Sequence, residues 1–339
     1  MVRPRRKGGG VGPPLDDSRV ALYRDAFVCT WHWGSVVSPR VLASLVYCGA
    51  AFGGAFLFMR LAAPELPALV VAFGRVSIAA LILLPVAGRE RLAALRLHWR
   101  DYAFVGFFMA AAPFALFAYA ERSLTAGLGS IINATTPLWT AIILAAWVHQ
   151  APTPRRIAAI VLGFAGVGII VGLEGLQLAP DALIGVIAAT AGAASYGIAL
   201  IYIRQRMGPQ PPVQLALGQL IAASLMLAPL AALSAGDVAP STESAVAMLG
   251  IALFSTAIAW PILFGLNRDV GPMATSTVTF LNPVFGSLWG AIFLAEAISP
   301  TFLAGSLLVF ASLALILGIR LPAVRRRAAP VAIPAEVDE

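Results

Sequence analysis

Arg75 is the residue whose position carries the clearest chemical consequence, because it lies in the middle of the apolar stretch 66–87. It is the only charged residue at mid-depth in any of ten such stretches. A charge at the centre of a bilayer costs at least ~2.5–3.5 kcal/mol on insertion scales, so intramembrane charges usually serve function. A guanidinium stays protonated and matches a carboxylate with two parallel hydrogen bonds. Arg75 is therefore predicted to anchor a substrate anion. The alternative is a structural arginine bonded to carbonyls and hydroxyls of neighbouring helices.

Two groups of polar residues follow helical spacing, and each ends at a proline. They are Ser130, Asn133, Thr136 with Pro137, and Ser276, Thr279, Asn282 with Pro283. Residues three apart lie near one helix face, and a proline removes a backbone donor and loosens the helix. We expect both stripes to border a central cavity, with the asparagines and threonines contacting substrate and the prolines acting as helix breaks or gates. Hydrogen bonding between packed helices is the alternative.

Two aromatic residues, Tyr196 and Trp260, lie deep in apolar stretches. They fit the lining of an apolar pocket with few polar groups, although core packing is the alternative. No Asp or Glu occurs at mid-depth, which argues against proton coupling through an intramembrane acid. The two cysteines and three histidines lack metal-ligand spacing, and no hydrolase or nucleotide-binding motif occurs. We predict no metal, no cofactor and no catalytic residue.

The composition places these residues in a membrane protein. Of the 339 residues, 60% are hydrophobic and 12% charged, and the mean hydropathy is +0.87. Soluble domains carry about 25% charged residues. The formal charge of +7 does not indicate nucleic-acid binding, because the charges fall between apolar runs and in the tails.

Ten runs are long enough to cross about 30 Å of hydrocarbon as helices. They are 41–59, 66–87, 101–120, 124–147, 156–173, 182–203, 213–233, 245–266, 271–294 and 300–319. With the N-terminus inside, twenty of the 23 Lys and Arg residues fall on the cytoplasmic side and two outside. This asymmetry predicts that both termini are cytoplasmic. Residues 1–37 and 321–339 are predicted to be cytoplasmic tails, the first of them disordered because of its charged, Gly- and Pro-rich composition.

The two halves of the chain repeat each other at an offset of 146 residues. Ser130 then falls on Ser276, Thr136 on Asn282 and Pro137 on Pro283. Five spans in each half would insert the second half upside down relative to the first. Inverted repeats are typical of secondary transporters, with the substrate site near the midplane.

These segments resemble the drug/metabolite transporter superfamily, in particular the ten-helix type built from two EamA repeats. The resemblance rests on FGRVSIAALILL at 73–84, TAGLGSIINATTPLWTAII at 125–143, LGFAGVGIIVG at 162–172 and MATSTVTFLNPVFGSLWGAIFLAEAIS at 273–299. The chain departs from the family at Cys48, where the first helix usually carries Trp before Gly49, and at His149-Gln150, where Gly-Glu is usual. The N-terminal tail has no counterpart in the family.

The sequence thus predicts an all-α integral membrane protein with ten transmembrane helices in two inverted five-helix repeats, at 38–173 and 180–320. It is expected to be a secondary transporter in the cytoplasmic membrane that exports small polar metabolites such as amino acids. Import, or transport of sugar-derived or nucleotide-linked solutes, is the alternative within carriers, and a membrane-embedded enzyme or receptor the alternative outside them. Its partners would be a small-molecule substrate and the lipid bilayer, without nucleic acid. A monomer suffices for this activity, and an oligomer is compatible with it.

Overall fold

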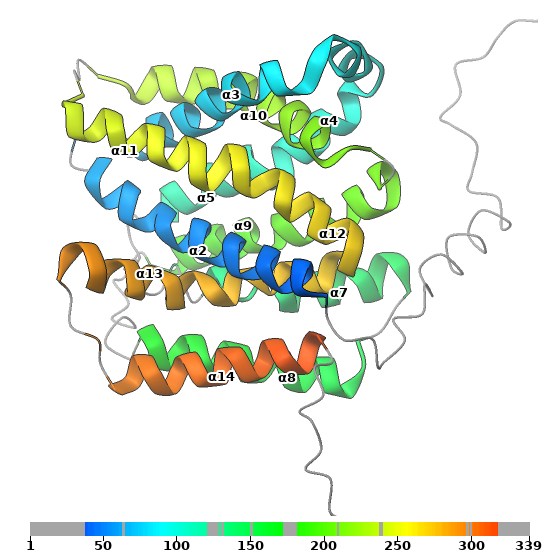
Figure 1. The fold of residues 1–339 in the computed structure, drawn as a ribbon, viewed down its shortest axis with the longest axis vertical. Helices are drawn as coiled ribbons and strands as arrows, with labels where there is room; N and C mark the ends of the chain where they lie inside the picture. The colour runs from blue at the N-terminus through cyan, green and yellow to red at the C-terminus, as the bar shows by residue number, and fades with distance from the viewer. Residues whose placement is uncertain are drawn as a thin grey trace, which may run out of the picture. The chain divides into compact units, whose positions relative to one another are not determined.

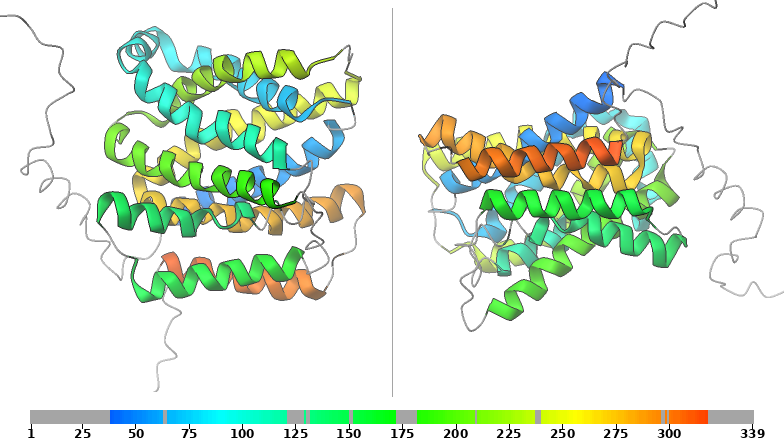
Figure 2. Two further views of the ribbon diagram at one scale, coloured as in Figure 1. Left: turned by 180° about the vertical axis from the view of Figure 1, so that it is seen from behind. Right: turned by 90° about the horizontal axis from the view of Figure 1, so that it is seen from below.

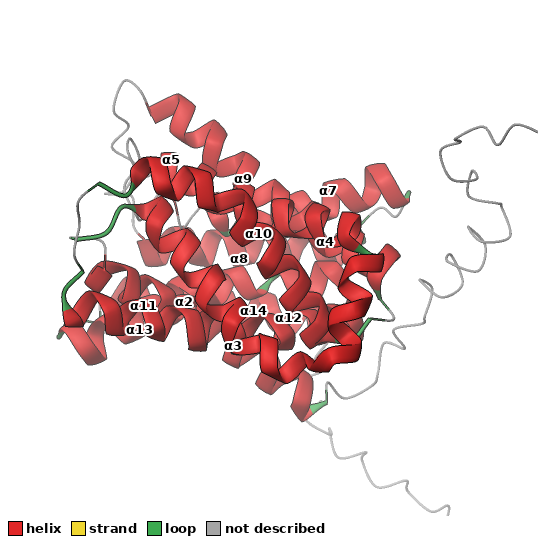
Figure 3. Ribbon diagram, turned by 90° about the horizontal axis from the view of Figure 1, so that it is seen from above, coloured by secondary structure: helices red, strands yellow, loops and turns green. Residues whose placement is uncertain are grey.

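The described part of the chain is helical, which confirms the all-α prediction (Figures 1 and 3). The computed structural model describes residues 38–62, 65–120, 129, 132–149, 152–171, 182–208, 210–236, 240–295, 298 and 300–317. Both predicted tails and Ser130 lie outside these residues.

In the described residues, the first half consists of α-helices and a π-helical segment (η1), which α5 continues. Their bounds are α2 (Pro39–Ala62), α3 (Ala68–Leu97), α4 (Trp99–Gly106), η1 (Phe107–Ala111), α5 (Ala112–Ala120), α7 (Thr136–Val148) and α8 (Pro154–Val171). The backbone of α3 breaks at Gly88, whose φ is 73°. A positive φ is accessible to glycine at little cost, so the apolar part of α3 ends where the sequence predicted.

The second half follows the same order, again with π-helical segments. Its elements are α9 (Ala182–Tyr202), η3 (Ile203–Met207), α10 (Pro212–Ser234), α11 (Thr242–Ala252), η4 (Leu253–Ile258), α12 (Ala259–Ser276), α13 (Val278–Leu294) and α14 (Pro300–Leu317). Here α12 breaks at Gly271, with φ 81°.

Six described segments are long and apolar enough to cross a membrane: Pro39–Met59, Ala68–Gly88, Trp99–Phe117, Leu183–Met207, Pro212–Ser234 and Thr242–Ser276. Shorter apolar helices cover Thr136–Trp147, Val278–Phe293 and Pro300–Ile316. Each of the ten predicted ranges contains helix in the described residues. The count of ten spans stays a prediction, since the segment before α7 lies largely outside them.

Local irregularities of the backbone recur at the offset of 146 residues that relates the two halves. The π-helical segments η1 and η4 begin at positions 107 and 253. The non-glycine residues with positive φ in the described chain are His149, at 56°, and Ala295, at 54°. Each caps its helix, and each backbone N–H donates to the carbonyl five residues earlier. The repeat therefore extends from residue types to backbone conformation.

The packing of the helices is reciprocal between the halves. The second helices of the two halves, α3 and α10, pack together, and so do the fifth, α8 and α14 (Figures 1 and 2). The fourth helix of each half packs on the first helix of the other, as α13 on α2 and α7 on α9. The third also packs on the first of the other half, as α5 on α9 and α11 and α12 on α2. Exchanging the halves thus maps these pairings onto themselves.

Glycine allows close backbone contact between some of these helices. A Cβ on Gly53 of α2 would lie 2.8 Å from the backbone N of Gly286 and 2.9 Å from the carbonyl O of Asn282, both on α13. Gly168 of α8 makes no such contact, because a Cβ there would have no atom of the described residues within 4 Å. In α8 the close contact with α14 is made by Gly166, where a Cβ would lie 2.7 Å from the Gly305 carbonyl O.

Gly53 and Gly168 should respond in opposite ways to substitution by alanine. Gly53→Ala should lower the free energy of unfolding by about 1–3 kcal/mol, because backbone atoms cannot move aside without separating α2 from α13. Gly168→Ala, the matched control, should be neutral or raise it by up to about 1 kcal/mol through helix propensity. Thermal unfolding of the purified variants measures both. A loss at Gly168 as large as that at Gly53 would contradict the contact assignment.

Candidate functional site

Arg75 lies in α3 with only 8% of its surface exposed. Its Nε donates to Oγ1 of Thr256 at 3.3 Å, and its Nη2 donates to the carbonyl O of Ser255 at 3.5 Å. The guanidinium carbon lies 4.6 Å from the centroid of the Phe114 ring on α5. The arginine of one half is therefore held by the third span of the other half and covered by an aromatic face, a favourable cation–π arrangement.

The π-helical segment η4 explains how the second half can receive this arginine. A π-helix shifts hydrogen bonds from the fourth to the fifth residue, and such segments often occur at functional sites. The Thr256 hydroxyl follows that register and donates to the Ile251 carbonyl at 2.9 Å. The Ser255 hydroxyl donates across to the Ala51 carbonyl of α2 at 2.5 Å. Helices α2, α3 and η4 are consequently joined at the level of Arg75.

The positive charge of Arg75 has no carboxylate partner within the described part of the chain. The described ion pairs join His98 to Asp101 and Arg268 to Asp269, both 3.5 Å apart. The hydrogen bonds to η4 use two of the five N–H groups of a guanidinium. The site thus combines a fixed cation with spare donors, which suits an anionic ligand.

Aromatic residues bring two more of the predicted site residues next to Arg75. The Phe114 ring meets Trp260 of α12 edge to face, with ring centroids 6.4 Å apart. One turn along α5, Phe117 stacks on Tyr196 of α9 at 6.5 Å. Trp260 is buried, and its indole Nε1 has no hydrogen-bond partner among the described residues. Arg75, Tyr196 and Trp260 therefore gather around α5, although they come from three other helices.

The structure gives the hydrogen-bond partners of the two polar stripes in the described residues. The Thr136 hydroxyl donates to the Asn133 carbonyl at 2.7 Å, and the Thr279 hydroxyl to the Ser276 carbonyl at 2.9 Å. Both threonines are thus satisfied by their own backbone. Asn133 and Asn282 instead have buried Oδ1 atoms without a partner in the described chain. In that part of the structure, no hydrogen bond joins either stripe to Arg75.

The two prolines do not occupy equivalent places in their helices. Pro137 is in the first turn of α7, where the missing N–H costs no hydrogen bond. Pro283 lies inside α13, and the nearest turn in the chain is at Thr277. The described helix breaks therefore precede the prolines.

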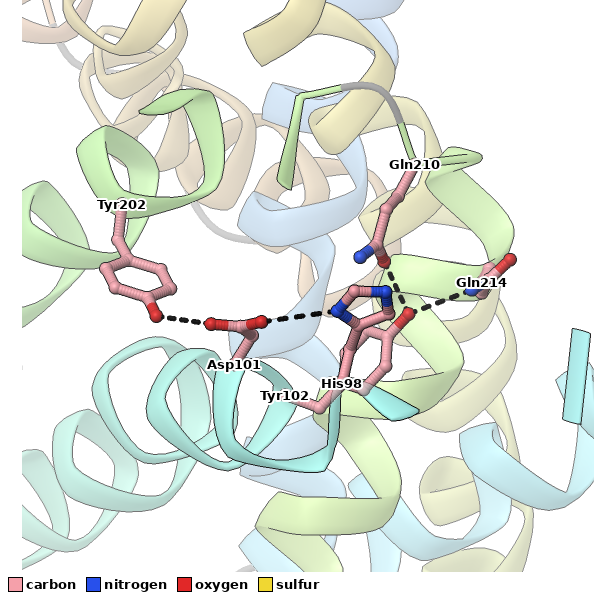
Figure 4. A network of polar contacts seen from close by, with 6 residues as sticks. All are labelled: His98, Asp101, Tyr102, Tyr202, Gln210 and Gln214. Carbon is pink, nitrogen blue, oxygen red and sulfur yellow. Dashed lines mark hydrogen bonds and ion pairs between the residues drawn. The ribbon is translucent and has the colours of Figure 1, made fainter. Parts of the chain in front are cut away.

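Polar contacts join the start of α4 to the end of α9 and the start of α10 (Figure 4). The Tyr202 hydroxyl at the end of α9 donates to Oδ1 of Asp101 in α4 at 2.5 Å, and Asp101 also pairs with His98. The Tyr102 hydroxyl donates to Gln210 and accepts from Nε2 of Gln214 in α10 at 3.0 Å. These contacts tie α4 to α9 and α10. We call the six residues that make them the α4 network: His98, Asp101, Tyr102, Tyr202, Gln210 and Gln214.

A single carboxylate links two loops elsewhere. Glu65, between α2 and α3, accepts from the backbone N–H of Ser241 at 2.7 Å. Ser241 is the N-cap of α11, and its own hydroxyl accepts from the backbone N–H of Ser244. The hydrogen bond from the Ser241 backbone N–H holds the pKa of the Glu65 carboxyl below its ordinary value. The α2–α3 loop is thereby fastened to the α10–α11 loop.

The sequence alone did not identify Ser255, Thr256 or Phe114 as parts of the site. Ser and Thr are common in membrane helices, so their types carried no signal. The irregular helix at η4, which presents them to Arg75, has no residue signature of its own.

Comparison with known proteins identifies the fold and the family. The model of the EamA-like transporter family matches residues 41–172 and again residues 183–318. The chain is similar to the uncharacterized transporter YvbV of Bacillus subtilis (strain 168), with 26% identity over 241 residues, covering 69% of this chain and 78% of that protein. Its similarity to the uncharacterized transporter YoaV of the same organism is 21% identity over 276 residues, covering 80% and 94%.

A solved structure described as "Crystal structure of protein" has the same fold, with a TM-score of 0.69 at 18% identity, covering 82% of this chain and 98% of that one. The two family matches cover both halves of the helical bundle. This multi-pass membrane protein therefore belongs to the EamA-like transporter family.

Proposed function

We propose that this transporter exports small carboxylate-bearing metabolites, amino acids foremost, across the cytoplasmic membrane by alternating access. The observation that carries the proposal is the buried guanidinium of Arg75, which has spare donors and no acidic partner in the described chain. A substrate carboxylate would supply the missing charge through a bidentate pair. The aromatic rings of Phe114 and Trp260 would exclude water around it.

Alternating access is supported by the reciprocal packing of the two halves. In inverted-repeat carriers, one repeat rocks against the other around a site near the midplane. The α4 network fastens spans of both halves at one end, and the Glu65–Ser241 bond fastens loops of both halves. Each of these contacts would have to break before the substrate site could open at the end of the bundle where that contact lies.

The proposed orientation has ten spans with both termini in the cytoplasm. Reporter fusions after Arg327 and in the loop near Glu174 should then report opposite sides of the membrane, because an odd number of spans separates them. Two fusions reporting the same side would contradict the count.

The proposed role of Arg75 predicts that charge alone does not suffice. Arg75→Lys should insert and fold but lower transport of carboxylates at least about tenfold, because an ammonium cannot reproduce the fork geometry and Lys loses a charge-assisted hydrogen bond. Counterflow in proteoliposomes across amino acids, organic acids and organic cations measures this. The panel also tests the alternative solutes, sugar-derived or nucleotide-linked.

Arg100→Lys is the matched control, since Arg100 is exposed and rests on the Trp99 ring. It should transport at the wild-type rate. Unchanged affinity of Arg75→Lys for every transported carboxylate would eliminate the anchor role. Loss of folding in Arg75→Lys would favour the structural arginine.

The stripes predict accessibility to water in both halves. Cysteines replacing Asn133 and Thr279, in a background lacking Cys29 and Cys48, should react with a water-soluble thiol reagent and be protected by transported substrate. Leu144→Cys, at a buried position, should stay inert. Inaccessibility of both test positions, with and without substrate, would assign the stripes to helix packing.

A further inference from the structure

Gln219 in α10 is a fully buried polar side chain that the candidate site does not use. None of its surface is exposed, and neither Oε1 nor Nε2 has a hydrogen-bond partner among the described residues. Burying an amide without partners opposes folding. Other polar side chains of α10 are satisfied, as Gln214 is by Tyr102 and Ser224 is by the Leu220 carbonyl at 2.7 Å. The exception at Gln219 therefore requires an explanation other than packing.

The repeat places Gln219 where the first half has Arg75. At an offset of 144 residues, two fewer than the 146 that relates the later parts of the two halves, AFGRVSIAALILLPVA of α3 aligns with ALGQLIAASLMLAPLA of α10. Gly74 and Arg75 then fall on Gly218 and Gln219, and Pro85 falls on Pro229. These two helices also pack on each other. One repeat thus carries a cation at this place and the other a neutral group that both donates and accepts.

The level of Gln219 in the bundle follows from a small pocket at the start of α10. Its lining includes Pro212 and Leu215 of α10 and Phe264 and Arg268 of α12. The start of α10 thus meets the middle of α12, and Figure 1 shows that these packed helices run in opposite directions. Gln219 is one turn beyond Leu215, and Trp260 is one turn before Phe264, since a turn takes 3.6 residues. Gln219 and Trp260 consequently lie at about the same depth.

We propose that Gln219, together with the indole N–H of Trp260, forms the neutral part of the substrate site whose cationic, anion-binding part is Arg75. Trp260 connects Gln219 with Arg75 in this site, because it contacts the Phe114 ring that covers the guanidinium. This inference rests on the function proposed above and narrows it. The substrate is a small carboxylate that carries a second hydrogen-bonding group, an amino or hydroxyl group, for which the amide supplies the missing partner.

Such a site rejects analogues that lack the second group, because its buried amide then stays unpaired. The test uses two matched series of acids: L-alanine, L-lactate and propionate, and L-phenylalanine, L-phenyllactate and 3-phenylpropionate. Within each series the carbon skeleton is constant and the second group is amino, hydroxyl or absent. Using two skeletons separates the polar requirement from size.

Counterflow in proteoliposomes compares the wild type with Gln219→Leu. In at least one series, the wild type should prefer one of the substituted acids over the unsubstituted acid by about tenfold or more, and Gln219→Leu should bring that ratio close to one. Ser224→Ala is the control on the same helix and should keep the wild-type ratio. A ratio that Gln219→Leu leaves unchanged overturns the inference. Equal transport of all three acids by the wild type also overturns it but leaves the proposed function standing, whereas transport of none overturns both.

Thermal unfolding provides a readout that does not depend on the choice of acid. A leucine removes the unpaired amide at similar volume, so Gln219→Leu should raise the Tm by about 2 °C or more while it abolishes discrimination. A lower Tm would show that the amide has a structural partner, and would overturn the inference. Ser224→Ala, which removes a satisfied hydroxyl, should leave the Tm near the wild-type value.

Discussion

The buried guanidinium of Arg75 is the constraint on which the arrangement of the central helices depends. Water cannot solvate it at this depth, so its donors must find acceptors inside the bundle. Straight α-helices offer few, because their carbonyls are already bonded within the helix. The π-helical segment η4 resolves this by presenting the Ser255 carbonyl and the Thr256 hydroxyl to the arginine. The π-helical segment η4 of the second repeat thus lies beside the charged side chain of Arg75 from the first repeat.

The helices and the repeat could be predicted because they follow from apolar length and from residue types, which are local properties. The partners of Arg75 could not, since Thr256 is 181 residues away in the chain and its position depends on how the halves pack. The polar stripes also show what residue spacing cannot predict. Their spacing predicted one shared face, but a threonine hydroxyl in a helix readily bonds the carbonyl three or four residues earlier, as Thr136 and Thr279 do. Spacing cannot distinguish a hydroxyl that faces a cavity from one that is satisfied locally.

Departures from the family pattern gain a physical meaning from the backbone. His149 takes the place of the usual glycine at the end of the fourth helix, and it adopts a left-handed conformation with φ 56°. Ala295 does the same in the second repeat. Glycine enters this region without steric cost, whereas residues with a Cβ pay of the order of 1 kcal/mol. The shape of the cap is therefore retained in both halves even though neither residue favours it.

Symmetric scaffolds carrying unlike groups orient what they bind. If both equivalent positions were arginine, two cations would share an apolar interior in which the described chain supplies no acid, and they would repel each other strongly at low dielectric. With Gln219 at the position equivalent to Arg75, the described interior holds the one charge of Arg75, and the proposed carboxylate substrate would neutralise it. The guanidinium has donors that its bonds to η4 do not use, so the carboxylate would pair with Arg75 while the link between α3 and the other repeat is kept. The amino or hydroxyl group would then face Gln219, and the two unlike positions would fix the orientation of the substrate.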